Sequence, residues 1–237
     1  MSSESGASAA GASGGFRRHW PVAVFTVGYL TVALIGAILR GNLEFLFYIA
    51  VMLVLIGVVL TVHRSVGLSS GALWGLSIWG LLHMAGGLLV VPEGWPVSAE
   101  SRVLYTLWLI PGRLKYDQIV HAYGFGMTTW VCWQALQSAI RRRGGKPEAS
   151  VGLMVLCAAA GLGFGALNEV VEFVATLLIP ETNVGGYRNT GWDLVSNLIG
   201  ATTAATWIWV SERRRAPAPD TVAVPTDGTG DVERCHE

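Results

Sequence analysis

About six long apolar stretches, each near the roughly 20 residues that a helix needs to cross a bilayer, constrain this chain most. They cover residues 20–39, 43–62, 68–91, 117–138, 151–179 and 192–210. Charged residues make up only 14% of the chain, whereas a typical soluble domain has about 25%. We therefore expect an all-α fold, a polytopic membrane helix bundle, over residues 16–212.

The two ends of the chain differ in composition from the apolar stretches. Residues 1–15 are rich in Ser, Gly and Ala, and residues 213–237 are rich in Pro, Asp, Thr and Gly. Segments that cannot bury enough apolar surface remain disordered. We expect a disordered tail at each end of the chain.

Basic residues predict the orientation of the spans, because cytoplasmic loops carry an excess of Lys and Arg. With both termini in the cytoplasm, that side holds Arg17, Arg18, Arg64, Arg141, Arg142, Arg143, Lys146, Arg213, Arg214, Arg215 and Arg234. The outer side then holds only Arg40, Arg102, Arg113, Lys115 and Arg188. This asymmetry favours both termini in the cytoplasm.

The longest predicted outer connection, residues 92–116, contains a short apolar segment. Residues 103–110 (VLYTLWLI) are too few to cross a bilayer. We interpret the segment as an interfacial helix or a re-entrant segment that ends before Pro111 and Gly112.

Strongly polar residues fall in the outer halves of the last four predicted spans. At about 1.5 Å per helical residue, His83 lies roughly 12 Å and Glu172 roughly 10 Å below the outer ends of their spans. Asp117 and Asp193 lie at the outer starts of theirs. Ionisable groups inside a membrane usually face a bundle interior or a wet cavity. The pattern predicts a site that opens to the extracytoplasmic side.

Three pairs of these residues have helical spacing, so each pair lies on one helical face. The pairs are Asp117 with His121, Glu169 with Glu172, and Asp193 with Asn197. Carboxylates and histidines on neighbouring helices are how metal sites in bundle cores are assembled, and they suit Zn, Mn or Fe. The candidate metal ligands are Asp117, His121, Glu169, Glu172 and Asp193, with His83 as a further candidate.

Simpler roles are compatible with several of these residues. His83 could be a hydrogen-bonded packing residue beside two glycines. Asp117 and Asp193 could cap their helices, since Asp is favoured at helix N-termini. Asn197 could be a hydrogen-bonding residue between helices.

Two acidic residues one turn apart are harder to explain as structural. Unpaired carboxylates at such depth cannot both remain ionised cheaply, so Glu169 and Glu172 need protons, a cation or a metal. Glu44, by contrast, lies close to Arg40 near the outer surface. We interpret that pair as an ordinary interfacial ion pair.

The order and spacing of these residues resemble two groups of bacterial membrane proteins. The pattern Asp117-x3-His121, Glu169-x2-Glu172 and Arg188-x4-Asp193-x3-Asn197 resembles the polar signature of VanZ-like proteins. The segments YDQIVHAYGF, NEVVEF and NTGWDLVSNLIGA are more similar to the YjdF-like inner-membrane family. The resemblance implies a helix bundle in the bacterial plasma membrane. The VanZ-like likeness also implies a loose association with cell-envelope chemistry.

Three functional hypotheses remain open at this point. In the first, a metal-dependent membrane enzyme uses Glu169, Glu172 and His121 for catalysis on a lipid or another anionic envelope intermediate. Its substrate would be bound by Arg113, Lys115, Arg188 and Asn197. The second hypothesis is a proton- or cation-coupled transporter, and the third is a structural membrane protein without chemistry. The expected partner in all three is the lipid bilayer, and the net charge of zero gives no reason to expect nucleic acid.

Overall fold

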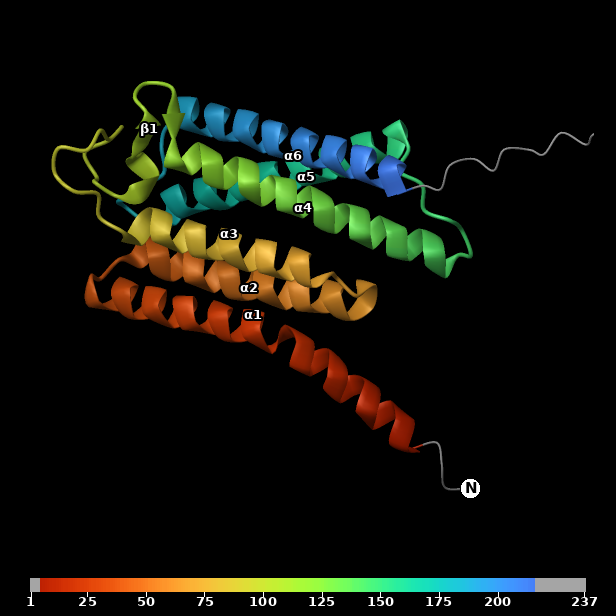
Figure 1. Cartoon of the computed structure of the whole chain (residues 1–237). Coiled ribbons are helices and arrows are strands. Elements are labelled where there is room, and N and C mark those ends of the chain that lie inside the picture. The colour runs from red at the N-terminus through yellow and green to blue at the C-terminus, as the bar shows by residue number, and fades with distance from the viewer. Residues whose placement is uncertain (1–4, 216–237) are drawn as a thin grey trace, which may run out of the picture.

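A computed structural model describes residues 5–215 of the chain, and their backbone forms six α-helices with one short hairpin at one end of the bundle (Figure 1). The helices are α1 (Ser5–Leu39), α2 (Leu43–Val66), α3 (Ser70–Leu88), α4 (Tyr116–Arg142), α5 (Val151–Leu178) and α6 (Tyr187–Arg215). Between α3 and α4 lie the 3-10 helix η1 (Leu104–Thr106) and the strands β1 (Trp108–Ile110) and β2 (Leu114–Lys115). The predicted helical fold is confirmed, apart from this hairpin.

Three helices are long and apolar enough to cross a membrane, namely His19–Leu39, Leu43–Val66 and Val151–Leu178. Their surfaces carry many exposed large apolar side chains, such as Leu39, Val54 and Leu177. Side chains of this kind are stable against lipid tails, so the composition and the surface both fit a bilayer protein. Figure 1 shows α3, α4 and α6 running alongside these helices.

Side-chain caps explain where several helices begin. Asn42 accepts a hydrogen bond from the Phe45 backbone N–H at the start of α2, and Ser69 and Ser150 do the same for α3 and α5. Such caps satisfy backbone donors that have no partner within the helix.

The connection between α3 and α4 corrects one prediction. Residues 103–110 do not form an interfacial α-helix. Instead they form η1 and β1, and β1 pairs antiparallel with β2. The reason is the turn at Pro111 and Gly112, where Gly112 has φ 70° and reverses the chain. The hairpin delivers Lys115 to the first turn of α4.

The ends of the bundle extend beyond the predicted limits. Helix α1 includes residues 5–15, which the sequence predicts to be a disordered tail, and this segment is rich in alanine, the best helix former. Figure 1 shows a bend within α1, and this helix contains Pro21, a residue type that commonly bends helices. Helix α6 continues to Arg215. The rest of both predicted tails, residues 1–4 and 216–237, lies outside the described residues.

Candidate functional site

Close contacts among α4, α5 and α6 bring the polar residues together. Helix α4 packs against α6 along much of its length, and α5 contacts both. At Gly200 an added Cβ would collide with the Ala122 backbone carbonyl of α4. At Gly165 it would lie 2.7 Å from the Asn197 side-chain nitrogen. Small residues are what allow membrane helices to approach this closely.

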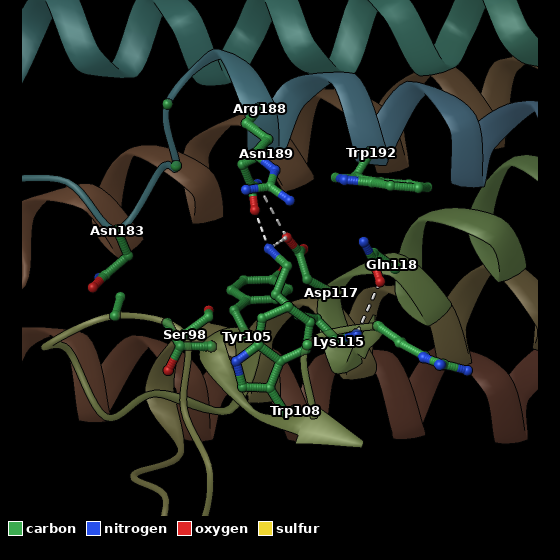
Figure 2. Close-up of a pocket in the computed structure, with 16 residues that line it drawn as sticks. Ser98, Tyr105, Trp108, Lys115, Asp117, Gln118, Asn183, Arg188, Asn189 and Trp192 are labelled. Carbon is green, nitrogen blue, oxygen red and sulfur yellow. Dashed lines mark hydrogen bonds and ion pairs between the residues drawn. The ribbon is translucent and has the colours of Figure 1, made fainter. Parts of the chain in front are cut away.

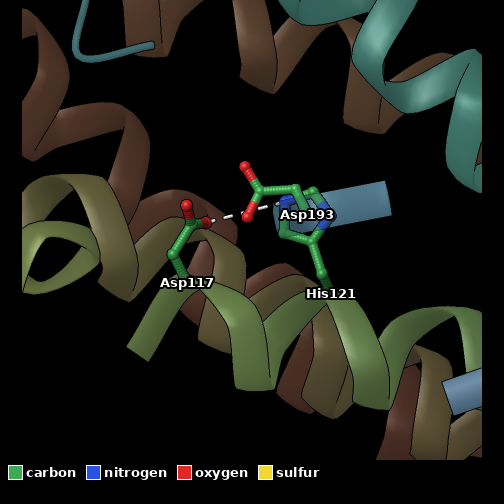
Figure 3. Close-up of side chains that lie close together, drawn as sticks. All are labelled: Asp117, His121 and Asp193. Atoms are coloured by element: carbon green, nitrogen blue, oxygen red, sulfur yellow. Dashed lines mark ion pairs between the residues drawn. The ribbon is translucent and has the colours of Figure 1, made fainter. Parts of the chain in front are cut away.

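His121 lies at the centre of the cluster and is only 4% exposed. Its Nε2 lies 3.6 Å from Asp117 Oδ1 and 3.8 Å from Glu172 Oε1. Its Nδ1 lies 3.6 Å from Glu169 Oε1 and 3.1 Å from Asn197 Oδ1. Figure 3 shows His121 and Asp117 on the same face of α4, with Asp193 beside them. The structure thus brings together side chains from α4, α5 and α6, which we call the acid cluster: Asp117, His121, Glu169, Glu172 and Asp193.

Asn197 determines which nitrogen of His121 carries the proton. The amide oxygen of Asn197 can only accept a hydrogen bond, so His121 Nδ1 donates to it. Nε2 is then left with its lone pair directed toward the carboxylates of Asp117 and Glu172. A histidine held in this way is prepared to bind a metal through Nε2.

Asn189 connects the Asp193 carboxylate to Asp117. Its side-chain nitrogen donates to Asp193 Oδ2 and, at 3.4 Å, to Asp117 Oδ2. Its side-chain oxygen accepts a hydrogen bond from Lys115 Nζ, which also lies 3.7 Å from Asp117 Oδ2. Sequence reasoning missed Asn189, although its position one turn before Asp193 on α6 is a detectable signal.

Several buried polar atoms of the cluster have no hydrogen-bond partner among the described residues. They are Glu169 Oε1 and Oε2, Asp193 Oδ1 and Asn197 Nδ2. Buried polar groups are nearly always paired, and an unpaired one is costly. The orphaned carboxylate oxygens therefore point to a missing cation, proton or water.

The donor atoms fit a divalent metal. Those of Asp117, His121 and Asp193 all lie within 4.8 Å of one another, as do those of His121, Glu169 and Glu172. Ligands about 2.1 Å from one ion are separated by about 3.0–3.4 Å, so shifts of a few tenths of an ångström bring the 3.6 and 3.8 Å pairs into range. Imidazole nitrogen with carboxylate oxygens suits Zn, Mn or Fe.

A cavity of about 750 Å³ opens beside the cluster (Figure 2). Arg113, Lys115 and Arg188 all line it, and Asp117 forms part of its wall. We call it the cationic cavity. The three basic residues that the sequence predicts to bind substrate thus share one cavity. Asn197 does not line this cavity; it is fully buried and its amide oxygen contacts His121.

His83 lies outside both groups of donor atoms, so the structure does not place it as a metal ligand. Its Nδ1 is 2.5 Å from the hydroxyl of Tyr105, which donates to the His83 backbone carbonyl at 2.9 Å. Burial raises the pKa of Tyr105 well above its usual value. These contacts fit the simpler interpretation of His83 as a hydrogen-bonded packing residue.

The structure differs from two other simple interpretations, that of Asp117 as a helix cap and that of Glu44 as an ion-pair partner of Arg40. Asp117 lies in the first turn of α4, but the helix begins after Lys115, so Asp117 is not its N-cap residue. Glu44 does not pair with Arg40. It accepts hydrogen bonds from Asn183, whereas Arg40 donates to the Leu88 carbonyl.

Toward their opposite end, these three helices pack an apolar cluster between them. Trp133, Met154, Cys157, Ala205 and Ile208 form a buried cluster there. Within the described residues, both groups of potential metal ligands lie toward the hairpin end of the bundle. The arrangement is a polar site with an opening at one end and an apolar plug at the other.

Comparison with known proteins places this arrangement in a family. Residues 21–214 match the profile of the family described as "Predicted membrane protein (DUF2238)", and that range covers more than four fifths of the chain. The chain belongs to the DUF2238 family. The matched range contains the whole acid cluster and the cationic cavity, so both lie within the part shared with DUF2238 proteins. No curated protein and no solved structure matches the chain.

Proposed function

We propose that this DUF2238 protein is a metal-dependent membrane enzyme that acts on an anionic lipid or cell-envelope intermediate from the extracytoplasmic side. One observation carries the proposal. Four carboxylates and a histidine from three helices converge beside a cavity that carries three basic side chains. A cation site next to an anion site is the arrangement expected for chemistry on a phosphoryl or carboxyl group.

Each residue of the acid cluster has a distinct role in this proposal. His121 would hold the ion either with Asp117 and Asp193 or with Glu172, the carboxylates that are grouped with it. Asn197 would keep His121 in the required tautomer. A bound Zn, Mn or Fe ion would polarise the substrate oxygen and lower the pKa of a water molecule.

Glu169 is the best candidate for a proton acceptor. It lies on the Nδ1 side of His121, with its Oε1 3.6 Å from that nitrogen, and it is buried. A general base must lie within hydrogen-bond reach of the proton that it accepts, directly or through one water molecule. A buried carboxylate beside the ion-binding groups meets this need.

The cationic cavity supports an anionic substrate. Guanidinium groups bind phosphates and carboxylates through paired hydrogen bonds, and Arg113 and Arg188 lie on its wall. Trp108 and Trp192 also line it, and tryptophan is enriched where a membrane meets water. A volume of about 750 Å³ suits a lipid headgroup rather than a lone small ion.

The apolar plug favours an enzyme over a transporter. A transport pathway needs polar groups toward both sides of the membrane, whereas the described inner end of α4, α5 and α6 packs Trp133, Met154 and Ile208 together. Proton- or cation-coupled transport is the alternative function if the purified protein contains no metal.

The placement in the membrane is part of the same proposal. All six helices would cross the bacterial plasma membrane, with both termini in the cytoplasm and the hairpin outside. The basic asymmetry and the depth of the polar residues support this orientation. The motif likeness further supports a YjdF-like protein, with VanZ-like proteins as more distant relatives.

Elemental analysis of the purified protein in detergent tests the proposal. About one equivalent of a transition metal is expected in the wild type, and much less in a Glu169→Gln/Glu172→Gln variant, because neutral amides are poor ligands. Glu148→Gln is the matched control, since Glu148 is exposed in the connection between α4 and α5 and lies outside the acid cluster. If none of the three proteins contained metal, the metal-dependent enzyme would be ruled out, and transport or a structural role would remain.

A further inference from the structure

Glu44 makes a contact that the proposed reaction does not use. It lies in the first turn of α2 and is buried, with 4% exposed. Its carboxylate accepts hydrogen bonds from the Asn183 backbone N–H at 3.0 Å and from the Asn183 side-chain amide at 2.8 Å. A buried carboxylate thus holds the connection between α5 and α6 against α2.

Asn183 forms part of the wall of three spaces. The first is the cationic cavity. The second is a groove of about 610 Å³ bordered by Arg40, Glu44 and Glu181, which we call the outer groove. The third is a chamber of about 30 Å³, and Glu44 lies on its wall as well. Glu44 and Asn183 therefore form a wall that the outer groove and the chamber share.

The chamber leads directly to the acid cluster. Asp117 and Glu172 both line it, together with the polar side chains of Tyr48 and His83. A space of this size holds about one water molecule when polar groups surround it. One small polar space therefore extends from the Glu44–Asn183 contact to two of the proposed metal ligands.

The two openings differ in charge. The cationic cavity is lined by three basic side chains and one carboxylate, whereas the outer groove is lined by two carboxylates and one arginine. An opening lined by one sign of charge concentrates ions of the opposite sign and repels those of the same sign. The cavity therefore suits an anion, and the outer groove suits a cation.

We propose that a divalent cation reaches the acid cluster through the outer groove and the chamber, with the Glu44–Asn183 contact as its gate. The anionic substrate enters separately through the cationic cavity. This inference rests on the proposed metal-dependent function and adds a dedicated route for the metal. Asn183 does not bind the metal; it controls how fast the metal enters and leaves.

The test measures how fast Mn²⁺ alone is bound and released by the full chain in detergent. Mn²⁺ uptake is followed by the loss of the free-ion electron paramagnetic resonance signal, and release by transfer to a chelator. Asn183→Ala removes the side-chain hydrogen bond to Glu44 and leaves the Glu44 charge in place. Both rates should rise about tenfold, the change expected when a hydrogen bond to a charged group no longer holds the gate closed. The dissociation constant should stay the same, because both rates change together.

Arg188→Gln is the matched control, because Arg188 lines only the cationic cavity among the three spaces. If the cation used that cavity, removing a positive charge would speed Mn²⁺ uptake in Arg188→Gln. That result would overturn the inference, as would unchanged rates in Asn183→Ala with Mn²⁺ bound normally. A wild-type protein that binds no Mn²⁺ or other transition metal would overturn the proposed function itself.

Discussion

At the scale of single residues, Asn197 is the residue whose role changes most between sequence and structure. The sequence identifies it by its spacing from Asp193, but spacing alone does not tell a ligand-contacting amide from a supporting one. The structure buries it completely and directs its oxygen to His121 Nδ1. Its contribution is to fix the histidine tautomer, which no sequence pattern encodes.

Replacing Asn197 with Ala should weaken metal binding by about 10–100-fold, the usual effect of removing a partner that orients a ligating histidine. Isothermal titration calorimetry with Mn²⁺ measures this directly. Thr202→Ala, on an exposed position of the same helix, should bind as the wild type does. Equal affinity in all three proteins would show that the Asn197 contact does not prepare His121 for a metal.

Tyr105 gives a prediction about pH. Its pKa is raised by burial, so the folded state favours the neutral hydroxyl. The neutral Tyr105 hydroxyl contributes fully to folding stability below the ordinary tyrosine pKa of about 10. This contribution is lost as the pH rises through the raised pKa of Tyr105 in the folded protein. The Tm of Tyr105→Phe should therefore fall less above pH 10 than the Tm of the wild type. A parallel decline in both would mean that Tyr105 is not protected from ionisation.

At the scale of helices and loops, the close approach of α4 and α6 determines whether the acid cluster can form. Gly200 is the contact point, because any side chain there meets the Ala122 carbonyl. Gly200→Ala should lower the free energy of unfolding by about 1–3 kcal/mol, the cost of overpacking. Gly200→Ala should also lower the amount of metal bound per protein molecule.

Gly191→Ala is the matched control on the same helix, because nothing lies within 4 Å of the added Cβ. It should be neutral or slightly stabilising, since Ala favours a helix over Gly by about 0.5–1 kcal/mol. Chemical unfolding of both variants, followed by circular dichroism, provides the comparison. Equal stability of the two variants would contradict the contact assigned to Gly200.

Hydrophobic length predicted the helices well, and helical spacing predicted which polar residues share a face. The connection between α3 and α4 was predicted less well, because an eight-residue apolar segment fits an interfacial helix and a strand equally. The Pro111-Gly112 turn decided the outcome. The contact between Glu44 and Asn183 joins residues far apart in the chain, and no local pattern could have indicated it.

At the scale of the whole molecule, the arrangement of the helices makes the two ends of the bundle chemically different. The hairpin end holds the acid cluster and the cationic cavity, and the far end holds the apolar plug. The function proposed above depends on the hairpin end facing the outside. The orientation is therefore the first property of the whole molecule to test.

Cysteine labelling from outside intact cells tests the orientation, in a background without native cysteines. Gly186→Cys, in the connection between α5 and α6, should react with a membrane-impermeant maleimide. Lys146→Cys, between α4 and α5, should react only after the cells are opened. In the proposed orientation, the basic loop lies in the cytoplasm. Equal labelling of both positions in intact cells would show that the orientation is wrong.

Thermal melting of the purified protein with and without a chelator tests the central claim most directly. A ligand that binds only the folded state at about 100 times its dissociation constant stabilises that state by about 2.7 kcal/mol. We predict that the chelator lowers the Tm of the wild type and that added Mn²⁺ or Zn²⁺ restores it. The Glu169→Gln/Glu172→Gln variant should respond to neither. A wild-type Tm that is unchanged by chelator and by added metal would contradict a metal site in the acid cluster.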